Sequence, residues 1–104
     1  ITKKNYYQKH PDHQRNRMYE REYGLSYLEV LKIWEKQGEK CPICNIEMFV
    51  KRQSSAYACI DHNHKTGKIR GLICGNCNTA IGLLHDNIKT VQSVLQYLKR
   101  YEND

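Results

Sequence analysis

Three features of the 104-residue chain predict a small α+β domain. Two Cys-x-x-Cys pairs enclose a segment with strand-like apolar runs, the second pair leads into a helical pattern, and further helical patterns lie before and after this unit. With 39% hydrophobic residues, one Trp and one Phe, the chain can build only a modest core. Because metal binding adds to the free energy of folding, a bound metal ion would compensate for that small core.

Residues 1–24 are expected to form a basic, tyrosine-rich arm or helix ahead of a domain that spans residues 25–104. Pro11 fits the first turn of a helix, where a missing backbone N–H does no harm. Basic residues alternate with tyrosines along the arm, and Arg15 and Arg17 are candidates for contacts with a phosphate backbone. A solvated helix without a partner explains the same composition, so both interpretations stay open.

Residues 26–37 carry the pattern of a capped helix. Ser26 and Glu29 form a capping-box pair, in which each side chain accepts a hydrogen bond from the other residue's backbone amide. Leu28 and Leu31 recur at helical spacing, so we expect them to pack into the core. This helix would lead the chain into the first cysteine pair.

Four cysteines have the spacing of a closed zinc site: Cys41, Cys44, Cys74 and Cys77. Two thiolates separated by two residues bind one ion from a tight turn, so two such pairs complete a tetrahedral site. The competing prediction is a pair of disulfides. It is disfavoured because no signal peptide is visible and five cysteines leave an odd one. Cys59 is the expected spare and should pack as a small apolar group.

The segment between the cysteine pairs is expected to form strands. The runs 48–50 and 57–60 are apolar and separated by a polar loop, and the run 69–73 follows a turn in which Gly67 can adopt a positive φ. A helix should begin at the second cysteine pair and end near Leu84. The resulting order is strand, turn, strand, helix.

Polar residues with metal-ligating or proton-transferring groups flank this hairpin. Asp61 and Asn78 offer oxygen ligands that suit a hard cation such as Mg²⁺. His62 carries an imidazole, the side chain that exchanges a proton near neutral pH. In a regular strand Asp61 and His62 would point to opposite faces, so we expect a loop near Asp61. A structural ion, a second ion and a base together predict a metal-dependent hydrolase.

Residues 88–101 are expected to form a final amphipathic helix. Its apolar residues are mostly three or four positions apart, and the stripe consists of Val91, Val94, Leu95 and Leu98. We expect this stripe to dock on the core of the same chain. An interface between two copies of the chain is the alternative.

The charge balance favours a polyanionic partner. Seventeen Lys and Arg residues against eleven Asp and Glu residues give a net charge of +6. No apolar run approaches the roughly 18 residues of a membrane span, so membrane insertion is not expected. Ile1 is not a usual start residue, and we expect an excised domain or a processed product. A cytoplasmic location is expected, because a reducing compartment suits free thiolates.

The hairpin motifs resemble those of the phage recombination endonuclease VII family, which belongs to the HNH or His-Me finger nucleases. The resemblance covers about residues 41–87. It is carried by Asp61-His62-x-His64, Gly67, Arg70-Gly71-Leu72, Cys74-x-x-Cys77-Asn78 and Gly82, preceded by Cys41-x-x-Cys44. It implies a ββα-metal core with the four-cysteine zinc site, flanked by N-terminal and C-terminal helices, in a phage-encoded or bacterial intracellular protein.

The resemblance implies a metal-dependent DNA endonuclease. Asp61 and Asn78 would hold one Mg²⁺ or Mn²⁺ against the scissile phosphate, and His62 would take a proton from the attacking water. The products would carry a 5′-phosphate and a 3′-hydroxyl. His64 would contact the phosphate or complete the metal shell, with an exposed turn histidine as the bland alternative.

Basic residues of the hairpin are candidates for contacts with DNA, which the resemblance implies as the substrate in duplex or branched form. Lys65, Lys68 and Arg70 carry the charge, although a surface salt bridge would explain Arg70 equally. The alternative function is a catalytically inactive zinc-finger module that binds nucleic acid. That alternative accounts for the cysteines but gives no reason for an Asp-His pair beside the turn.

Overall fold

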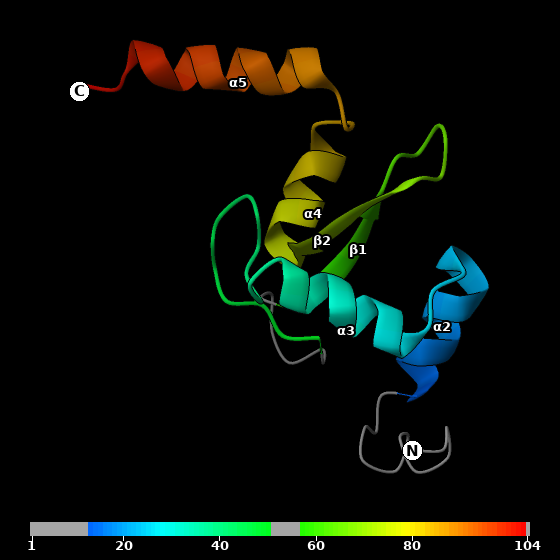
Figure 1. Cartoon of the computed structure of the whole chain (residues 1–104). Helices are drawn as coiled ribbons and strands as arrows, with labels where there is room; N and C mark the ends of the chain where they lie inside the picture. The colour runs from blue at the N-terminus through cyan, green and yellow to red at the C-terminus, as the bar shows by residue number, and fades with distance from the viewer. Residues whose placement is uncertain (1–12, 51–56, 104) are drawn as a thin grey trace.

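The computed structural model describes residues 13–50 and 57–103, with side chains from residue 18 onward. The elements are α2 (His13–Tyr23), α3 (Tyr27–Lys36), β1 (Ala58–His62), β2 (Ile69–Cys74), α4 (Gly75–Leu83) and α5 (Ile88–Arg100). In Figure 1 the two strands form a hairpin beside α4, α3 lies near the base of the hairpin, and α5 extends away from the rest. The predicted α+β class is confirmed.

The predicted basic arm is described only in part. Residues 1–12, which include Pro11, lie outside the described residues. Arg15 and Arg17 belong to α2, but their side chains also lie outside the described part. The rest of α2 packs against α3.

Helix α3 begins with the predicted capping box. Ser26 Oγ accepts a hydrogen bond from the Glu29 amide at 3.1 Å, and Glu29 Oε1 accepts one from the Ser26 amide at 3.1 Å. The predicted burial of Leu28 is wrong, since its side chain is 51% exposed. Tyr27 and Val30 are the buried residues of this helix. They lie three positions apart on one face, whereas Leu28 is rotated by about 100° from Tyr27.

The core lies between α2, α3, the hairpin and the segment that precedes β1. Tyr19 of α2 stacks on Tyr27 of α3 with ring centroids 6.4 Å apart. The indole Nε1 of Trp34 donates a hydrogen bond to the backbone oxygen of Met48 at 2.9 Å. The buried members are Tyr19, Tyr27, Val30, Cys41, Met48, Val50, Ala58, Ile60, Leu72, Ile73 and Cys74. Two of them are cysteines of the Cys-x-x-Cys pairs, so the core and the metal-ligand cluster are continuous.

The predicted strand over residues 48–50 is not a strand. Phe49 makes a single parallel bridge with Tyr57, and the segment joins no sheet. Met48 and Val50 are buried while Phe49 is 43% exposed. The side chains therefore alternate between core and solvent as in a strand, but the segment makes no continuous series of backbone hydrogen bonds with a neighbouring strand. The predicted polar loop at residues 51–55 lies outside the described residues.

Helix α5 forms over nearly the predicted range, but it does not dock on the core. None of its residues is buried, and Val91, Val94, Leu95 and Leu98 are between 39% and 61% exposed. The chain turns away from α4 at His85 and Asp86, which adopt positive φ values of 59° and 51°. Figure 1 shows α5 beyond the end of α4. An amphipathic pattern indicates that the apolar face of a helix packs against another surface, but it does not identify that surface.

Among the described residues, no helix combines the length and apolar character needed to cross a bilayer.

Candidate functional site

Four cysteines meet where the first Cys-x-x-Cys turn approaches the start of α4. The sulfur atoms of Cys41, Cys44, Cys74 and Cys77 all lie within 4.8 Å of one another. The Cys44 and Cys74 sulfurs are 3.6 Å apart, far beyond the length of a disulfide, and no cysteine is oxidised. Thiolates bound at about 2.3 Å around a tetrahedral zinc ion would lie roughly 3.8 Å apart. The cluster therefore fits one tetrahedral ion, and the disulfide alternative fails.

Backbone amides point at the sulfurs of this cluster. The amide of Cys74 donates to Cys41 Sγ at 3.5 Å, and the amide of Cys77 donates to Cys74 Sγ at 3.4 Å. Burial acts to raise the pKa of Cys41, but hydrogen bonds from the amides of Cys44, Cys74 and Ile43 outweigh it and lower the pKa to about 6. Burial raises the pKa values of Cys74 and Cys77. A bound cation would have to displace protons from these two thiols.

Cys59 lies outside the cluster, as predicted. It is half-buried on β1 and lines a cavity of about 250 Å³ with tyrosines of α2.

The hairpin carries a β-bulge beside Asp61. Asp61 pairs with Gly71 and His62 pairs with Ile69, so Arg70 is an extra residue on β2. The predicted loop near Asp61 is therefore wrong, because β1 continues to His62. The departure from regular pairing lies on the opposite strand, where the bulge shifts the register of β2 between Asp61 and His62.

Glycine is required at position 71 of the bulge. The φ of Gly71 is 152°, a conformation that residues with a side chain rarely adopt. A Cβ atom there would lie 2.8 Å from Gln37 Oε1. Gln37, at the end of α3, is thus in close contact with the bulge at Gly71, the residue that pairs with Asp61.

Arg70 forms ion pairs with two carboxylates. Its Nε and Nη2 atoms donate to Asp61 Oδ2 and Oδ1, each at 2.8 Å. Nη2 also donates to Asp86 Oδ1 at 3.0 Å, and Nη1 donates to Asp86 Oδ2 at 3.4 Å. The hydrogen bonds that Arg70 donates to these carboxylates, to Asp61 above all, raise the pKa of Arg70. The salt-bridge interpretation of Arg70 is confirmed.

Asp86 was not singled out in the sequence. Arg70 and Asp86 are 16 residues apart, and their contact depends on the reversed backbone after α4. A lone Asp after a helix carries no pattern that would have predicted it.

Aromatic rings surround His62 at the end of β1. The rings of His62 and His64 have centroids 4.6 Å apart, and the ring of Tyr23 meets the His62 ring edge-on at 5.5 Å. Burial is the largest cause that raises the pKa of Tyr23, so its hydroxyl stays protonated near neutral pH. The two predicted histidines are therefore brought together, with α2 supplying a third ring.

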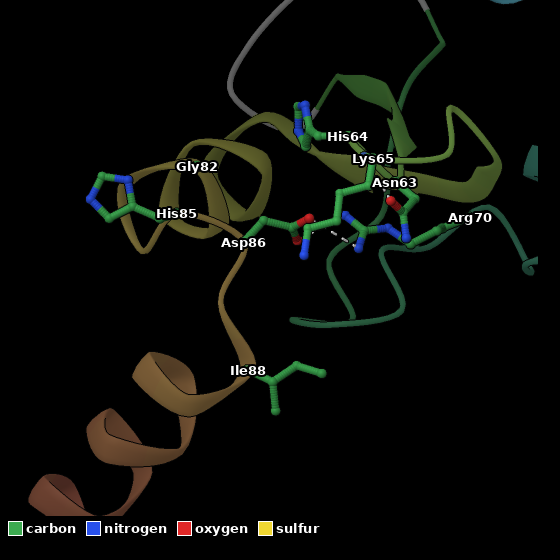
Figure 2. A pocket seen from close by; sticks show the side chains of 8 residues that line it. All are labelled: Asn63, His64, Lys65, Arg70, Gly82, His85, Asp86 and Ile88. Carbon is green, nitrogen blue, oxygen red and sulfur yellow. Dashed lines mark hydrogen bonds and ion pairs between the residues drawn. The ribbon is translucent and has the colours of Figure 1, made fainter.

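A cavity of about 580 Å³ opens between the hairpin turn and the end of α4 (Figure 2). Its lining consists of Asn63, His64, Lys65, Arg70, Gly82, His85, Asp86 and Ile88. Figure 2 shows the Asp86 carboxylate facing the Arg70 guanidinium, while the His85 ring points away from Arg70. Asn63 Oδ1 accepts hydrogen bonds from the amides of Lys65 and Thr66 at 2.8 and 3.1 Å, which fixes the turn. Lys68 is exposed on the same turn.

Asn78 lies on α4 and lines the 250 Å³ cavity beside Tyr23 and Cys59. Helix α4 packs against both strands of the hairpin, but no hydrogen bond joins Asn78 to Asp61. Asp61 is instead held by Arg70, which lines the 580 Å³ cavity. The structure thus places the two candidate oxygen ligands on neighbouring elements, with no hydrogen bond between them.

Comparisons with known proteins agree with this geometry. The model of the recombination endonuclease VII family matches residues 8–100. The Gene 59 protein of Mycobacterium phage D29 is 38% identical over 79 residues, which cover 75% of this chain and 46% of that protein. The Gene 59 protein of Mycobacterium phage L5 is 38% identical over 77 residues, which cover 73% of this chain and 44% of that protein.

A solved structure shares the fold. The crystal structure of the ββα-Me type II restriction endonuclease Hpy99I is 39% identical, with a TM-score of 0.54. The match covers 74% of this chain and 43% of that chain. It confirms the ββα-metal core. In each of these three matches the aligned region covers less than half of the known protein.

Proposed function

We propose that this chain, which belongs to the recombination endonuclease VII family, is a metal-dependent endonuclease that hydrolyses DNA phosphodiester bonds. The observation that supports this most is the hairpin and helix unit at the four-cysteine cluster. Its first strand carries Asp61 and His62, and its helix carries Asn78 close to the cluster. An acid, a base and an amide thus come from adjacent elements of one ββα unit.

The four-cysteine cluster is proposed to hold a structural zinc ion. Four thiolates and no open position are the ligand set of a closed zinc site. The ion would tie the turn that contains Cys41 and Cys44 to the N-terminus of α4, and so fix the helix that carries Asn78.

Asp61 and Asn78 are proposed to hold one Mg²⁺ or Mn²⁺. Asp61 fits a cation, because both of its oxygens already accept charge-assisted hydrogen bonds from a guanidinium. Asn78 offers an amide oxygen from its exposed side chain on α4, although no hydrogen bond joins it to Asp61. When bound, the cation would stabilise the negative charge that develops on the leaving 3′ oxygen.

His62 is the proposed general base. Its ring would accept a proton from water as the water oxygen bonds to phosphorus and the bond from phosphorus to the 3′ oxygen breaks. The 3′ oxygen takes a proton from solvent, which leaves a 5′-phosphate and a 3′-hydroxyl. Tyr23 and His64 limit the rotation of the His62 ring, so a nitrogen can stay directed at the water.

Basic side chains around the 580 Å³ cavity are proposed to contact the DNA backbone. Lys65, Arg70 and His64 all line the cavity. Lys68, Arg15 and Arg17 would extend the contact, and the net charge of +6 favours a polyanion of duplex or branched form. The arm at residues 1–24 would then act with the domain at 25–104 on one substrate.

A homodimer is a second proposal, supported by α5. Its apolar stripe is exposed along about two turns and has no cover within the described part of this chain. A second copy would bury the stripe and place a second active site on the other DNA strand.

Plasmid cleavage tests the proposed activity. Supercoiled DNA incubated with the protein and Mg²⁺ or Mn²⁺ should become nicked or linear, and chelation should stop the reaction. His62→Ala, purified in the same way, controls for contaminating nuclease and should be about 100-fold or more slower. Equal cleavage by both preparations would reject the assignment. DNA binding without cleavage by the parent would favour the inactive zinc-finger alternative.

A further inference from the structure

Arg70 lies where a metal ion would have to enter. Its guanidinium donates to both oxygens of Asp61 at 2.8 Å, so a cation bound there would lie beside the positive charge of the guanidinium while this pair persists. The side chain of Asp61 is only 13% exposed, which leaves little room for an ion to approach from another side. Because the two positive charges repel and the site is confined, we expect Arg70 to move away from Asp61 when a divalent cation binds there.

Asp86 offers Arg70 a second carboxylate. Arg70 Nη2 contacts Asp61 Oδ1 and Asp86 Oδ1 at 2.8 and 3.0 Å, so the guanidinium spans the two acids. Two carboxylates and one guanidinium leave a net charge of −1. The net negative charge of the bridge would attract a dication to Asp61.

The backbone fixes the position of Asp86. Its amide donates to the Ile81 oxygen of α4 at 2.9 Å, and its φ of 51° belongs to a tight reversal that starts at His85. The carboxylate therefore stays at the end of α4 even when Arg70 is displaced. It faces the 580 Å³ cavity that Lys65 and His64 also line.

We propose that Asp86 is a positioning residue, which holds the Arg70 guanidinium when a divalent cation takes the carboxylate of Asp61. This inference rests on the proposed cation site at Asp61. Arg70 would keep its hydrogen bonds to Asp86 and remain beside the cavity, where a phosphate can meet it. Without Asp86, the entering cation would face an unpaired guanidinium and a site with no net negative charge.

Mn²⁺ binding measures this role without any cleavage. The free Mn²⁺ signal in electron paramagnetic resonance, recorded on the zinc-loaded full chain without DNA, gives the affinity directly. Asp86→Asn should bind Mn²⁺ roughly threefold to tenfold more weakly, the range expected when one partner of a half-exposed ion pair is lost. The Mn²⁺ concentration for half-maximal plasmid cleavage should rise by the same factor.

A double-mutant cycle separates action through Arg70 from direct charge. In an Arg70→Gln background the same Asp86→Asn substitution should change the Mn²⁺ affinity by about twofold or less. An equal loss in both backgrounds would mean that Asp86 acts on the cation itself, and would overturn the positioning role. Unchanged Mn²⁺ affinity in Asp86→Asn would also overturn it.

Asp61→Asn distinguishes this inference from the proposed function. If the parent binds Mn²⁺ and cleaves DNA, and Asp61→Asn loses both, the cation site stands and the Asp86 result decides the inference alone. If Asp61→Asn binds Mn²⁺ as the parent does, the proposed cation site and the role of Asp86 fail together. Equal thermal midpoints of Asp86→Asn and the parent would exclude a folding defect as the cause of weaker binding.

Discussion

The side-chain amide of Gln37 hydrogen-bonds to both backbone groups of Leu72. Gln37 Nε2 donates to the Leu72 oxygen at 2.8 Å, and the Leu72 amide donates to Gln37 Oε1 at 2.9 Å. The side chain thus pairs with β2 as a neighbouring strand would, and joins the end of α3 to the hairpin. Gly71, which precedes Leu72, faces Asp61 across the hairpin. This contact supports the backbone on which the candidate site is built.

Gly71→Ala should destabilise the fold and disturb the site. The new Cβ would lie 2.8 Å from Gln37 Oε1 at a φ of 152°, so we expect a loss of about 1–3 kcal/mol in the free energy of unfolding. Urea denaturation measures the change. Gly67→Ala is the matched control, because its φ is also positive but no atom lies within 4 Å of the new Cβ.

Gln37→Ala should remove the steric part of the Gly71→Ala effect. In the Gln37→Ala background, Gly71→Ala should lower the free energy of unfolding by less than it does in the parent, because only the backbone conformation remains unfavourable. If the effects of the two substitutions on the free energy of unfolding simply add in the double variant, the contact between the new Cβ and Gln37 does not contribute to the loss.

Cys44→Ser should release the zinc ion and unfold much of the domain. The core is small and shares two residues with the cluster, so we expect a loss of more than about 4 kcal/mol. Zinc content by atomic absorption and thermal unfolding provide the measurements. Cys59→Ser is the control, because Cys59 lies outside the cluster and should retain the zinc ion. A folded, zinc-free Cys44→Ser protein would contradict a structural role for the metal.

Local signals in the sequence predicted the parts of the fold that depend on neighbouring residues. The capping box of Ser26 and Glu29 needs only residues three apart. The cysteine cluster joins two pairs that lie far apart in the sequence. It could still be predicted, because each pair is a local motif and a tetrahedral ion needs the four ligands that the two pairs provide together. Such features can be identified before the tertiary structure is known.

Features that depend on register or on chain reversal could not be predicted. The bulge at Arg70 follows from how two strands align, which their apolar pattern does not specify at a polar end. Asp86 reaches Arg70 only because the chain reverses at His85, a non-glycine residue with positive φ. The helical pattern of α5 was visible, whereas its lack of contact with the core was not.

Leu95→Lys should abolish a homodimer without unfolding the monomer. Leu95 is 49% exposed in a single copy, so a charged side chain costs the monomer little but would be buried at a paired α5 surface. Sedimentation velocity over a range of protein concentrations reports the change. Ser93→Lys on the opposite face of α5 is the control and should sediment as the parent does. A parent that remains monomeric at high concentration would contradict the proposed dimer.

Asn78→Ala should weaken cleavage through the cation while DNA binding is preserved. Removing a proposed oxygen ligand should reduce cleavage at limiting Mg²⁺ by about 10- to 100-fold. Asp61→Ala should be more severe, because it also removes the charge that attracts the cation. Neither change removes a basic residue, so binding of a labelled duplex without Mg²⁺ should keep the parent's affinity and its steep salt dependence.

Asn76→Ala is the matched control. Asn76 is exposed on the same helix, and its substitution by Ala removes the same side-chain amide. Two measurements test this prediction: the cleavage rate as a function of Mg²⁺ concentration, and the affinity for DNA as a function of salt concentration. If Asn78→Ala and Asn76→Ala respond to Mg²⁺ alike, Asn78 is not a ligand, and Asp61 must hold the cation with other partners.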